Sequence, residues 1–479
     1  MPKIEIQNDL IVYSTAAGTD TLQAAINQAI ASQKPLYIGP GSYSVTSLRI
    51  DDKIKIFAMK GSVTINSSGA NCFYITVQSG VSGARISDVT IEGLVLDGEN
   101  KPFATGIARP GLIRCVNADR LMIKDCFISR SDRAGVDLIQ SAGTISGNEF
   151  YGCRTSIYSN KSLGLDISEN YIRDSKDNGI VIWRADQAFD GTSIGGNRIY
   201  GVQNDTGGSG EFGNGVFVYQ SNSVTSFSNV ISGCNYSALR YSQSSNAIIS
   251  SNQISSTRET AIFVEAPDDN AAPYEGIVVS SNAIFDAGDG IKIVNPNLGS
   301  RRSTISSNVL KNISQKTFVQ WASPSRDPAT QYTVTTPGNG ITVSSDAVVH
   351  ANTIESCGFA GIALTIAGTY NATTGVGRDQ NTIAVLVNDN IVKNCPVGVG
   401  YSDDDPRGYA EVSENMIVGA SNAAITRVSV TNLPNVPNNP NNGFGPLVRR
   451  PGAPDVGGNA DPITTRFSFF RNKVIPKTV

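Results

Sequence analysis

Asparagine recurs along this chain inside a short apolar phrase of the form Ile-Ser-x-Asn-x-Ile. Several neighbouring copies lie only 22 to 25 residues apart, and Asp125 takes the asparagine position in the segment IKDCFI. A short repeat that cannot bury its own apolar face has to stack on further copies of itself. Because the phrase is strand-like, we expect each repeat to form one coil of a parallel β-helix. The repeated residues are Asn148, Asn170, Asn197, Asn229, Asn252, Asn282, Asn308, Asn352, Asn390, Asn415 and Asn472.

We expect these asparagines to have a structural role. Stacked side-chain amides form hydrogen bonds with the copies above and below, and asparagine tolerates the left-handed backbone of a tight bend. Both properties stabilise a coil without any contribution to catalysis or binding.

A second strand phrase, Gly-Ile-x-Val, follows nine residues after several of the asparagines, as in GIVIW (179–183) and AIFVE (261–265). Side chains alternate between the two faces of a strand, so its second and fourth letters are predicted to point inward. The third and fifth letters should then face solvent. The outward face of this phrase is therefore where functional side chains are expected.

The outward letters predict an exposed stripe of aromatic and charged side chains. An exposed aromatic stripe usually marks a binding surface, and flat rings with charged neighbours suit the apolar and polar sides of a sugar ring. The alternative is that loops or a partner subunit cover the rings, since interfaces use the same residue types. The residues predicted to bind substrate are Tyr158, Trp183, Arg184, Asp190, Phe217, Tyr219, Glu259 and Phe263.

Three charged residues on successive coils, Arg240, Glu265 and Lys292, are the predicted catalytic group. One cation would neutralise a uronate and the other would remove its α-proton, although Glu265 opposes the low pKa that a basic residue needs for this step. A hydrolase instead needs two carboxylates, which Glu265 could form with a nearby acidic residue. A surface salt bridge without catalytic importance is the third interpretation. The candidate second carboxylates are Asp190, Glu259, Asp268 and Asp269.

Composition excludes several classes of protein. The net charge of −3 provides no basic field for nucleic acid, and no apolar run reaches the roughly 18 residues of a membrane span. The seven cysteines form no CxxC motif, so we expect buried free thiols. The lone His350 is expected to be structural. The run 403–405 offers carboxylates that calcium favours, but a solvated turn is the simpler interpretation, and no cofactor is expected.

The two ends of the chain differ from the repeats. The segment 19–33 places Leu22, Ala25, Ile26, Ala29 and Ile30 on one helical face, with Thr19 or Asp20 as cap, and such a helix would cover the unpaired end of a β-helix. We expect the β-helix with this cap to span residues 1–432. A Pro/Asn/Gly-rich loop should follow at 433–462, and a terminal strand at 463–479.

The opening TDTLQAAINQAI…PLYIGPGSYSV resembles the N-terminal cap of the pectate-lyase-like right-handed parallel β-helix superfamily. The phrases NGIVIWRADQAFDGTSIGGNRI, GGSGEFGNGVFVY, SALRYSQSSNAIISSNQIS and ETAIFVE look like those of the twin-arginine-translocated repeat protein family. The fold implied is an all-β, single-stranded right-handed parallel β-helix. This second resemblance implies export, although the opening MPKIEIQNDL contains no twin-arginine segment or apolar signal stretch. A homotrimer is suggested only by analogy with the superfamily.

We therefore expect an exported protein that acts on a poly- or oligosaccharide, first as a lyase for an acidic glycan. A glycoside hydrolase or glycan transferase with paired carboxylates is the second hypothesis, and a non-catalytic glycan-binding or envelope-assembly protein is the third. The chain has no Gly-His-Gly of polygalacturonase-like enzymes and no Asp-Pro-His-Glu of alginate-epimerase-like enzymes, which argues against those two reactions.

Overall fold

The computed structural model divides the chain into two units, Met1–Gln203 and Asn204–Val479, each with its own internal contacts. The described residues are 3–7, 9–14, 21–104, 110–265, 274–294, 303–322, 326–365, 383–402, 408–427, 429–430, 447–448 and 467–475. None of the helices in these ranges is long and apolar enough to cross a membrane.

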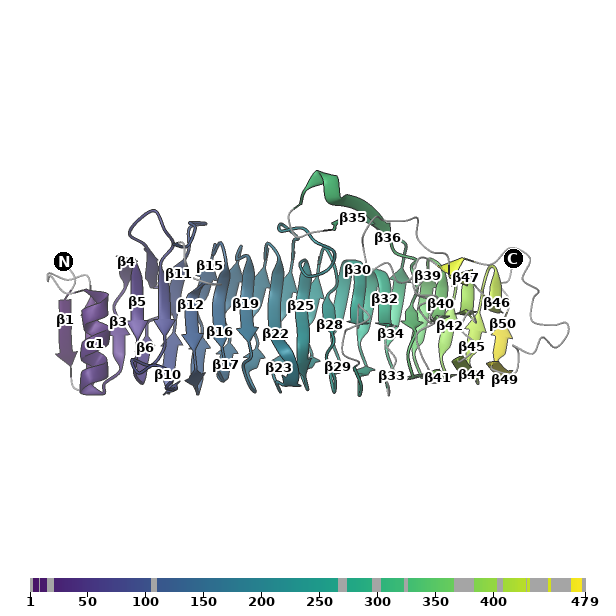
Figure 1. The fold of residues 1–479 in the computed structure, drawn as a ribbon, viewed down its shortest axis with the longest axis horizontal. Helices are drawn as coiled ribbons and strands as arrows, with labels where there is room; N and C mark the ends of the chain where they lie inside the picture. The colour runs from purple at the N-terminus through teal and green to yellow at the C-terminus, as the bar shows by residue number, and fades with distance from the viewer. Residues whose placement is uncertain are drawn as a thin grey trace. The chain divides into compact units, whose positions relative to one another are not determined.

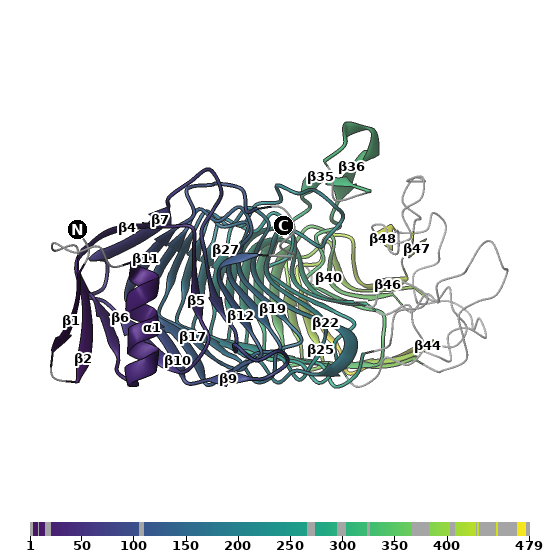
Figure 2. The same cartoon turned by 60° about the vertical axis from the view of Figure 1, so that its left-hand side comes forward.

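Unit 1 begins with an antiparallel pair, β1 (Lys3–Gln7) and β2 (Leu10–Ser14), followed by the helix α1 (Leu22–Ser32) beside the first coils (Figures 1 and 2). The predicted apolar face of α1 is buried, except that Ile30 is half-buried. The predicted cap was wrong, because the Thr21 side chain accepts the hydrogen bond from the backbone N–H of Ala24. Thr21 is extended and directly precedes the first turn, as an N-cap must.

Unit 1 stacks its strands in parallel rows (Figure 1). After β2, the first row contains β3 (Leu36–Ile38), β6 (Ile54–Phe57), β10 (Val89–Glu92), β14 (Leu121–Lys124), β17 (Gly143–Ser146), β20 (Asp166–Ser168) and β23 (Ser193–Gly195). The second contains β4 (Gly41–Val45), β7 (Val63–Ser67), β11 (Leu94–Asp97), β15 (Phe127–Ser129), β18 (Glu149–Tyr151), β21 (Tyr171–Arg173) and β24 (Arg198–Tyr200). The third contains β5 (Ser47–Ile50), β8 (Tyr74–Val77), β12 (Gly111–Val116), β16 (Ala134–Ile139), β19 (Thr155–Asn160) and β22 (Asn178–Phe189).

Unit 2 repeats this plan. Its first row contains β26 (Thr225–Phe227), β29 (Ile248–Ser250), β31 (Val278–Ser280), β33 (Ser303–Ser306), β38 (Ala347–His350), β41 (Ile383–Asn388), β44 (Gly408–Ser413) and β49 (Phe467–Phe470). Its second contains β27 (Val230–Ser232), β30 (Gln253–Glu265), β32 (Ala283–Val294), β34 (Val309–Ile313), β39 (Thr353–Cys357), β42 (Ile391–Lys393), β45 (Met416–Val418) and β50 (Lys473–Ile475). The long strands β30 and β32 continue into the third row, with β25 (Asn214–Asn222), β28 (Leu239–Ser242), β37 (Ile341–Val343), β40 (Ala360–Thr365), β43 (Val397–Ser402) and β46 (Ala423–Arg427).

One antiparallel hairpin projects from the parallel rows of unit 2 (Figure 1). It consists of β35 (Thr317–Trp321) and β36 (Gln331–Thr335), with the short 3-10 helix η1 (Pro328–Thr330) between them. A second, very short pair joins β47 (Ser429–Val430) to β48 (Leu447–Val448). The segment expected as a terminal strand forms β49 and β50, whereas the expected loop 433–462 lies outside the described residues apart from β48.

The asparagine ladder is confirmed in both units. In unit 2 the side chain of Asn282 donates to Oδ1 of Asn308 at 2.9 Å, while its own Oδ1 accepts from the side chain and the backbone N–H of Asn252 at 2.9 and 3.0 Å. The predicted bend was misplaced by one residue. Ser281 and Ser307, which precede these asparagines, have the left-handed backbone. The asparagine is thereby free to turn its amide into the stack.

Asp125 was placed wrongly in the ladder. The residue that stacks on Asn148 is Cys126, whose backbone N–H donates to Asn148 Oδ1 at 3.0 Å. Asp125 has a φ of 54° and therefore occupies the left-handed position before the ladder. The inward letters of the second phrase are buried as predicted, and the seven cysteines are all buried free thiols. Side-chain alternation alone was sufficient to predict which face forms the core.

Candidate functional site

The stacking register places the predicted residues of unit 2 in one column. Phe217 of β25 pairs with Arg240 of β28, Arg240 with Phe263 of β30, and Phe263 with Lys292 of β32. Glu265 stands two residues after Phe263 on the same strand, so that it lies on the same face. The sequence therefore predicted correctly which outward residues would be neighbours.

The column is covered, contrary to the expectation of an exposed aromatic stripe. Phe217 and Phe263 are only 5% and 7% exposed, and Tyr219 is half-buried. The Phe263 ring is covered by its own neighbours, because Arg240 and Lys292 each place their cationic group 4.9 Å from its centre. The backbone at Gly210, in the loop 205–213, closes directly over the Arg240 guanidinium. The rings are therefore covered, but the cover shown over Phe263 consists of side chains of the same column, whereas the loop lies over Arg240.

Arg240 lies at the centre of an ion-pair network. Its guanidinium nitrogens contact Glu265 Oε1 at 2.6 and 2.7 Å, and its third nitrogen lies 3.5 Å from Glu259 Oε2. Burial lowers the pKa of Arg240, but the charges of Glu265 and Glu259 outweigh burial and hold that pKa above its ordinary value. Arg240 is therefore permanently cationic, which excludes it as a general base.

An irregularity in β30 directs two adjacent residues to different surroundings. The register of β30 against β32 shifts between Thr257 and Thr260, and Arg258 and Glu259 lie in this bulge. Glu259 accepts a hydrogen bond from the Ser237 hydroxyl at 2.8 Å and faces Arg240. Arg258 is exposed and lines a pocket. Bulges commonly redirect side chains in this way next to functional sites.

Asp289 of β32 belongs to the same group of charges and was not predicted from the sequence. Its Oδ1 accepts the backbone N–H groups of Gly338 and Asn339 at 3.0 and 2.9 Å. Burial raises the pKa of Asp289 to about 7, although the charge of Lys292 and these two hydrogen bonds lower it. A carboxyl group with this pKa exchanges its proton near neutral pH. We call Arg240, Glu259, Glu265, Asp289 and Lys292 the charged cluster.

The hairpin β35–β36 forms a pocket of about 540 Å³ with the turns of neighbouring coils. We call this the hairpin pocket. Its lining combines cations with aromatic rings, and the Arg326 guanidinium stacks 5.2 Å from the centre of the Trp321 ring. Tyr236 links the pocket to the charged cluster, because the charges of Glu259 and Arg240 both act on its hydroxyl. The lining residues are Asn204, Asn235, Tyr236, Arg258, Lys316, Thr317, Phe318, Val319, Trp321 and Arg326.

Four predicted binding residues, Tyr158, Trp183, Arg184 and Asp190, lie in unit 1. Tyr158 and Trp183 are half-buried. Arg184 is paired with Asp186 at 2.9 Å, and burial raises the pKa of Asp190 above its ordinary value. The other proposed carboxylates, Asp268 and Asp269, lie outside the described residues, as does the acidic run 403–405. Elsewhere in the described ranges, no group of three His, Cys, Asp or Glu side chains is arranged to hold a metal ion.

Stacked parallel rows around a buried amide ladder define the parallel β-helix class of protein. The chain belongs to the right-handed β-helix family, whose sequence model matches residues 58–199, 111–266 and 188–375, together more than half of the chain. The comparison with curated proteins gave no match.

Three solved structures illustrate the likeness of fold. A surface adhesin of Streptococcus pneumoniae, PfbA, has 12% identity and a TM-score of 0.46, with 85% of this chain and 88% of the adhesin covered. The N-terminal fragment of gene product 12 of bacteriophage Phi29 has 12% identity and a TM-score of 0.45, with coverages of 86% and 66%. The A-module of an Azotobacter vinelandii mannuronan C-5 epimerase has 12% identity and a TM-score of 0.40, with 95% of both chains covered. These likenesses are too distant to indicate a substrate.

Sequence reasoning missed the hairpin pocket and Asp289 for identifiable reasons. The hairpin 317–335 interrupts the repeat pattern and contains Trp321, one of only two tryptophans in the chain. An interruption of a regular repeat that contains a rare aromatic residue was therefore a usable signal. Asp289 had no such signal, because its raised pKa comes from burial, which depends on the packing of neighbouring coils.

Proposed function

We propose that unit 2 binds an acidic polysaccharide in the hairpin pocket and cleaves it by β-elimination at the charged cluster. The observation that supports this proposal most directly is the lining of the hairpin pocket, which joins three cations to an accessible tryptophan. Aromatic faces bind the C–H side of sugar rings, and guanidinium groups bind carboxylates through paired N–H donors.

The charge of the hairpin pocket fits an acidic sugar. Lys316 is paired with Asp286 at 2.8 Å, and Arg326 lies 3.6 Å from Asp205. Arg258 has no ion-pair or hydrogen-bond partner for its side chain within the described ranges, so it adds an uncompensated positive charge. A uronate carboxylate would supply the missing counter-charge.

The pocket wall also contains an unused donor. Asn204 accepts the backbone N–H of Gly207 at 2.8 Å through Oδ1, which fixes the orientation of its amide. The buried Nδ2 of the same side chain has no partner among the described residues. A buried donor without an acceptor costs about 1–3 kcal/mol, so an acceptor brought by a ligand would stabilise this wall.

The proposed reaction uses the cluster residues in separate roles. A base removes the proton next to the uronate carboxylate, the electron pair forms a carbon–carbon double bond, and the glycosidic C–O bond breaks. The departing oxygen takes a proton from water. Asp289, with its pKa of about 7, is the proposed base, and Lys292 is the proposed neutraliser of the carboxylate. Glu265 orients Arg240, whose charge is already balanced.

Access to this cluster requires movement of the loop 205–213, because Gly210 covers Arg240. Tyr236 ties the same loop to the pocket wall by donating its hydroxyl to the carbonyl of Gly208 at 2.9 Å. Binding of a sugar chain beside Tyr236 would disturb this tie. Opening of the loop on binding is therefore part of the proposal.

A glycoside hydrolase is the second candidate, and the grouping of three carboxylates favours it. Burial raises the pKa of Asp289 to about 7, and the charge of Glu259 adds to this effect, so Asp289 can hold a proton near neutral pH beside two other carboxyl groups. Two carboxyl groups in opposite protonation states are what acid–base hydrolysis of a glycoside uses.

The first experiment is incubation with polygalacturonate, alginate, hyaluronate, dextran and xylan, with ultraviolet absorbance of unsaturated uronate and new reducing ends measured together. We expect both signals with at least one acidic polymer, and a rate that rises as the pH increases through about 7, where Asp289 ionises. Reducing ends without absorbance would indicate the hydrolase. Binding without either signal would leave the non-catalytic glycan-binding hypothesis.

Two pairs of variants separate binding from chemistry. Trp321→Ala should weaken binding of the acidic polymer about tenfold, as the loss of an aromatic contact does, whereas exposed Phe285→Ala on β32 is the control. Lys292→Met should lower the rate with little loss of binding, and exposed Lys311→Met on β34 is its control. Full activity of both Trp321→Ala and Lys292→Met would contradict the proposal.

We also propose that the chain is exported, as its resemblance to the twin-arginine-translocated repeat family implies. Fractionation of the source cells, followed by immunodetection of the chain, tests this. Recovery of the protein in the cytoplasmic fraction alone would contradict export.

A further inference from the structure

A second face, in unit 1, carries the exposed aromatic and charged pattern that the sequence predicted elsewhere. It is the outward side of the second row, formed by β18, β21 and β24. Register places Glu149, Tyr171 and Arg198 in one column, and Tyr151, Arg173 and Tyr200 in the next. These residues flank the asparagines of the ladder, and none belongs to the charged cluster or the hairpin pocket.

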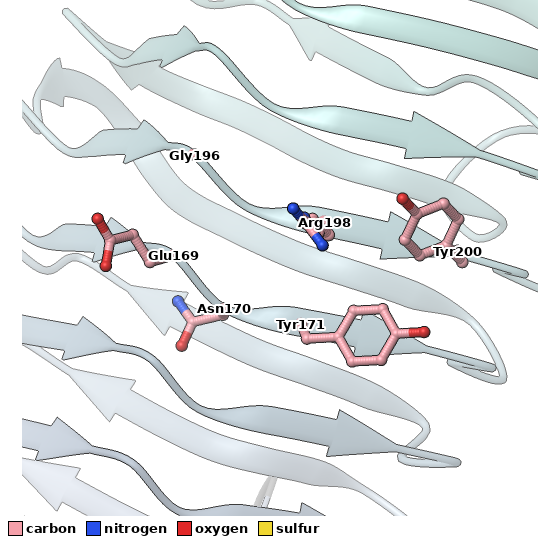
Figure 3. Close-up of a pocket in the computed structure, with 6 residues that line it drawn as sticks. All are labelled: Glu169, Asn170, Tyr171, Gly196, Arg198 and Tyr200. Carbon is pink, nitrogen blue, oxygen red and sulfur yellow. The ribbon is translucent and has the colours of Figure 1, made fainter.

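The face contains a pocket of about 610 Å³ (Figure 3). Tyr171 and Tyr200 extend from successive strands and meet edge to face, with ring centres 5.8 Å apart. Arg198 stands between them and Glu169, which lies at the far end of the pocket (Figure 3). The lining residues are Glu169, Asn170, Tyr171, Gly196, Arg198 and Tyr200. This volume is in the range of small-molecule binding sites.

The rest of the face is held in place by its own contacts. Arg173 stacks on the Tyr151 ring at 4.2 Å and bonds Glu149 Oε1 at 3.0 and 3.1 Å. Asn170 forms the floor of the pocket, and its amide bonds to Asn197 Oδ1 at 3.0 Å and to the carbonyl of Ile145 at 2.8 Å. The floor of the pocket is therefore fixed by the asparagine ladder.

The groups that remain available are of both signs. Tyr171 is 40% exposed, and Glu169 and Arg198 are also exposed. In the described part of the chain, neither charged side chain forms an ion pair or a hydrogen bond. The pocket thus offers an aromatic surface with donors on one side and an acceptor on the other. Sugar hydroxyls both donate and accept, whereas Glu169 would repel a carboxylate.

We infer that this pocket is a second saccharide site, which binds a neutral, hydroxyl-rich pyranose segment of a polysaccharide. The C–H face of the ring packs on Tyr171, its hydroxyls accept from Arg198, and a further hydroxyl donates to Glu169. The site rests on the proposed function only in taking a polysaccharide. The site attaches the protein to a polysaccharide, and it takes no part in cleavage.

Affinity electrophoresis in gels containing dextran, laminarin, xylan or galactomannan tests this inference, with polygalacturonate as the acidic comparison. We expect at least one neutral polymer to retard the protein. Tyr171→Ala should weaken that interaction about tenfold, Tyr171→Phe should retain it, and Arg198→Ala should weaken it. Phe189→Ala removes an aromatic side chain of unit 1 that is 63% exposed and lies outside the pocket, and it should change nothing.

The outcomes for the two sites are distinguishable. Trp321→Ala should retain binding of neutral polymers, and Tyr171→Ala should retain product formation from short acidic oligosaccharides. An inactive wild-type protein that still shows Tyr171-dependent retardation would overturn the proposed reaction alone. The inference is overturned if no neutral polymer retards the wild type, or if Tyr171→Ala and Arg198→Ala both bind as tightly as the wild type.

Discussion

Asp289 shows how position changes the chemistry of a single residue. In the native state its pKa is about 7, against an ordinary 3.8, because burial disfavours the charged form. A raised native pKa gives a stability contribution that is complete below pH 3.8 and is lost as the pH rises through about 7. Within the charged cluster, the charge of Lys292 lowers the pKa of Asp289 and the charge of Glu259 raises it, and the value of about 7 includes both effects.

We predict that Asp289→Asn removes this pH dependence. Asparagine retains an oxygen to accept from Gly338 and Asn339 but has no charge to desolvate. The difference in unfolding free energy between the variant and the wild type should therefore grow in favour of the variant between pH 4 and 7, measured by urea denaturation. A constant difference across that range would show that Asp289 has an ordinary pKa in the native state.

Gly210 has a φ of +151°, and any Cβ at this position would collide with the Arg240 guanidinium. We predict that Gly210→Ala displaces the loop 205–213 and destabilises the protein by about 1–3 kcal/mol. Thermal denaturation measures the loss, and limited proteolysis should show faster cleavage in this loop. Gly164→Ala, at an exposed turn with φ +60° and open space around the Cβ, controls for backbone strain alone. Equal effects of the two substitutions would mean that the loop does not close over Arg240.

For single residues, the sequence predicted which side chains are neighbours better than it predicted which side chains are exposed to solvent. The pairing of Phe217, Arg240, Phe263 and Lys292 follows from strand alternation and a constant repeat. Burial of Phe263 does not follow, because it depends on how the long side chains of Arg240 and Lys292 lie over its ring. The bulge that directs Arg258 and Glu259 to different surroundings could not be predicted from the sequence either, since neither residue type indicates a shift in register.

The asparagine ladder is the element that stabilises each coil against the next. Asn282 donates to Asn308 and to the carbonyl of Ile249, and it accepts twice from Asn252. Each hydrogen bond contributes about 1 kcal/mol net, and removal of the side chain would leave its buried partners unsatisfied. Substitution at this position should therefore destabilise the protein strongly.

We predict that Asn282→Ala lowers the unfolding free energy by about 3–5 kcal/mol. Asn422→Ala, at an exposed position in unit 2, should change it by less than about 0.5 kcal/mol. Urea denaturation followed by circular dichroism compares the two variants. A loss below about 1 kcal/mol for Asn282→Ala would show that the ladder is not the main stabilising element of these coils.

The elements themselves were largely predictable. A period of 22 to 25 residues and the alternation within each phrase indicate stacked coils, and an apolar helical face followed by a strand indicates the cap. The errors were of one or two residues, at the helix cap, at Asp125 and at the left-handed bend before each ladder asparagine. Sequence patterns locate apolar periodicity well, whereas caps and left-handed bends depend on single backbone hydrogen bonds.

For the molecule as a whole, the net charge of −3 gives no long-range attraction for a polyanion. Binding in the hairpin pocket must therefore come from local cations. We predict that the affinity for polygalacturonate falls at least about threefold between 0.05 and 0.5 M NaCl, because added salt screens charges at the protein surface. Retardation by neutral polymers at the Tyr171 pocket should be unchanged over the same range. Equal salt dependence of the two interactions would show that they share one site.

The sequence by itself determined the repeat, the inward faces, the amide ladder and the columns in which outward residues stack. These properties follow from short-range alternation and a nearly constant period. Only the tertiary structure decided that Arg240 is closed under the loop 205–213, that Asp289 titrates near neutrality, and that the exposed aromatic face lies around Tyr171. Each of these depends on which segments of chain approach from other coils, and this approach sets solvent access and the local electric field.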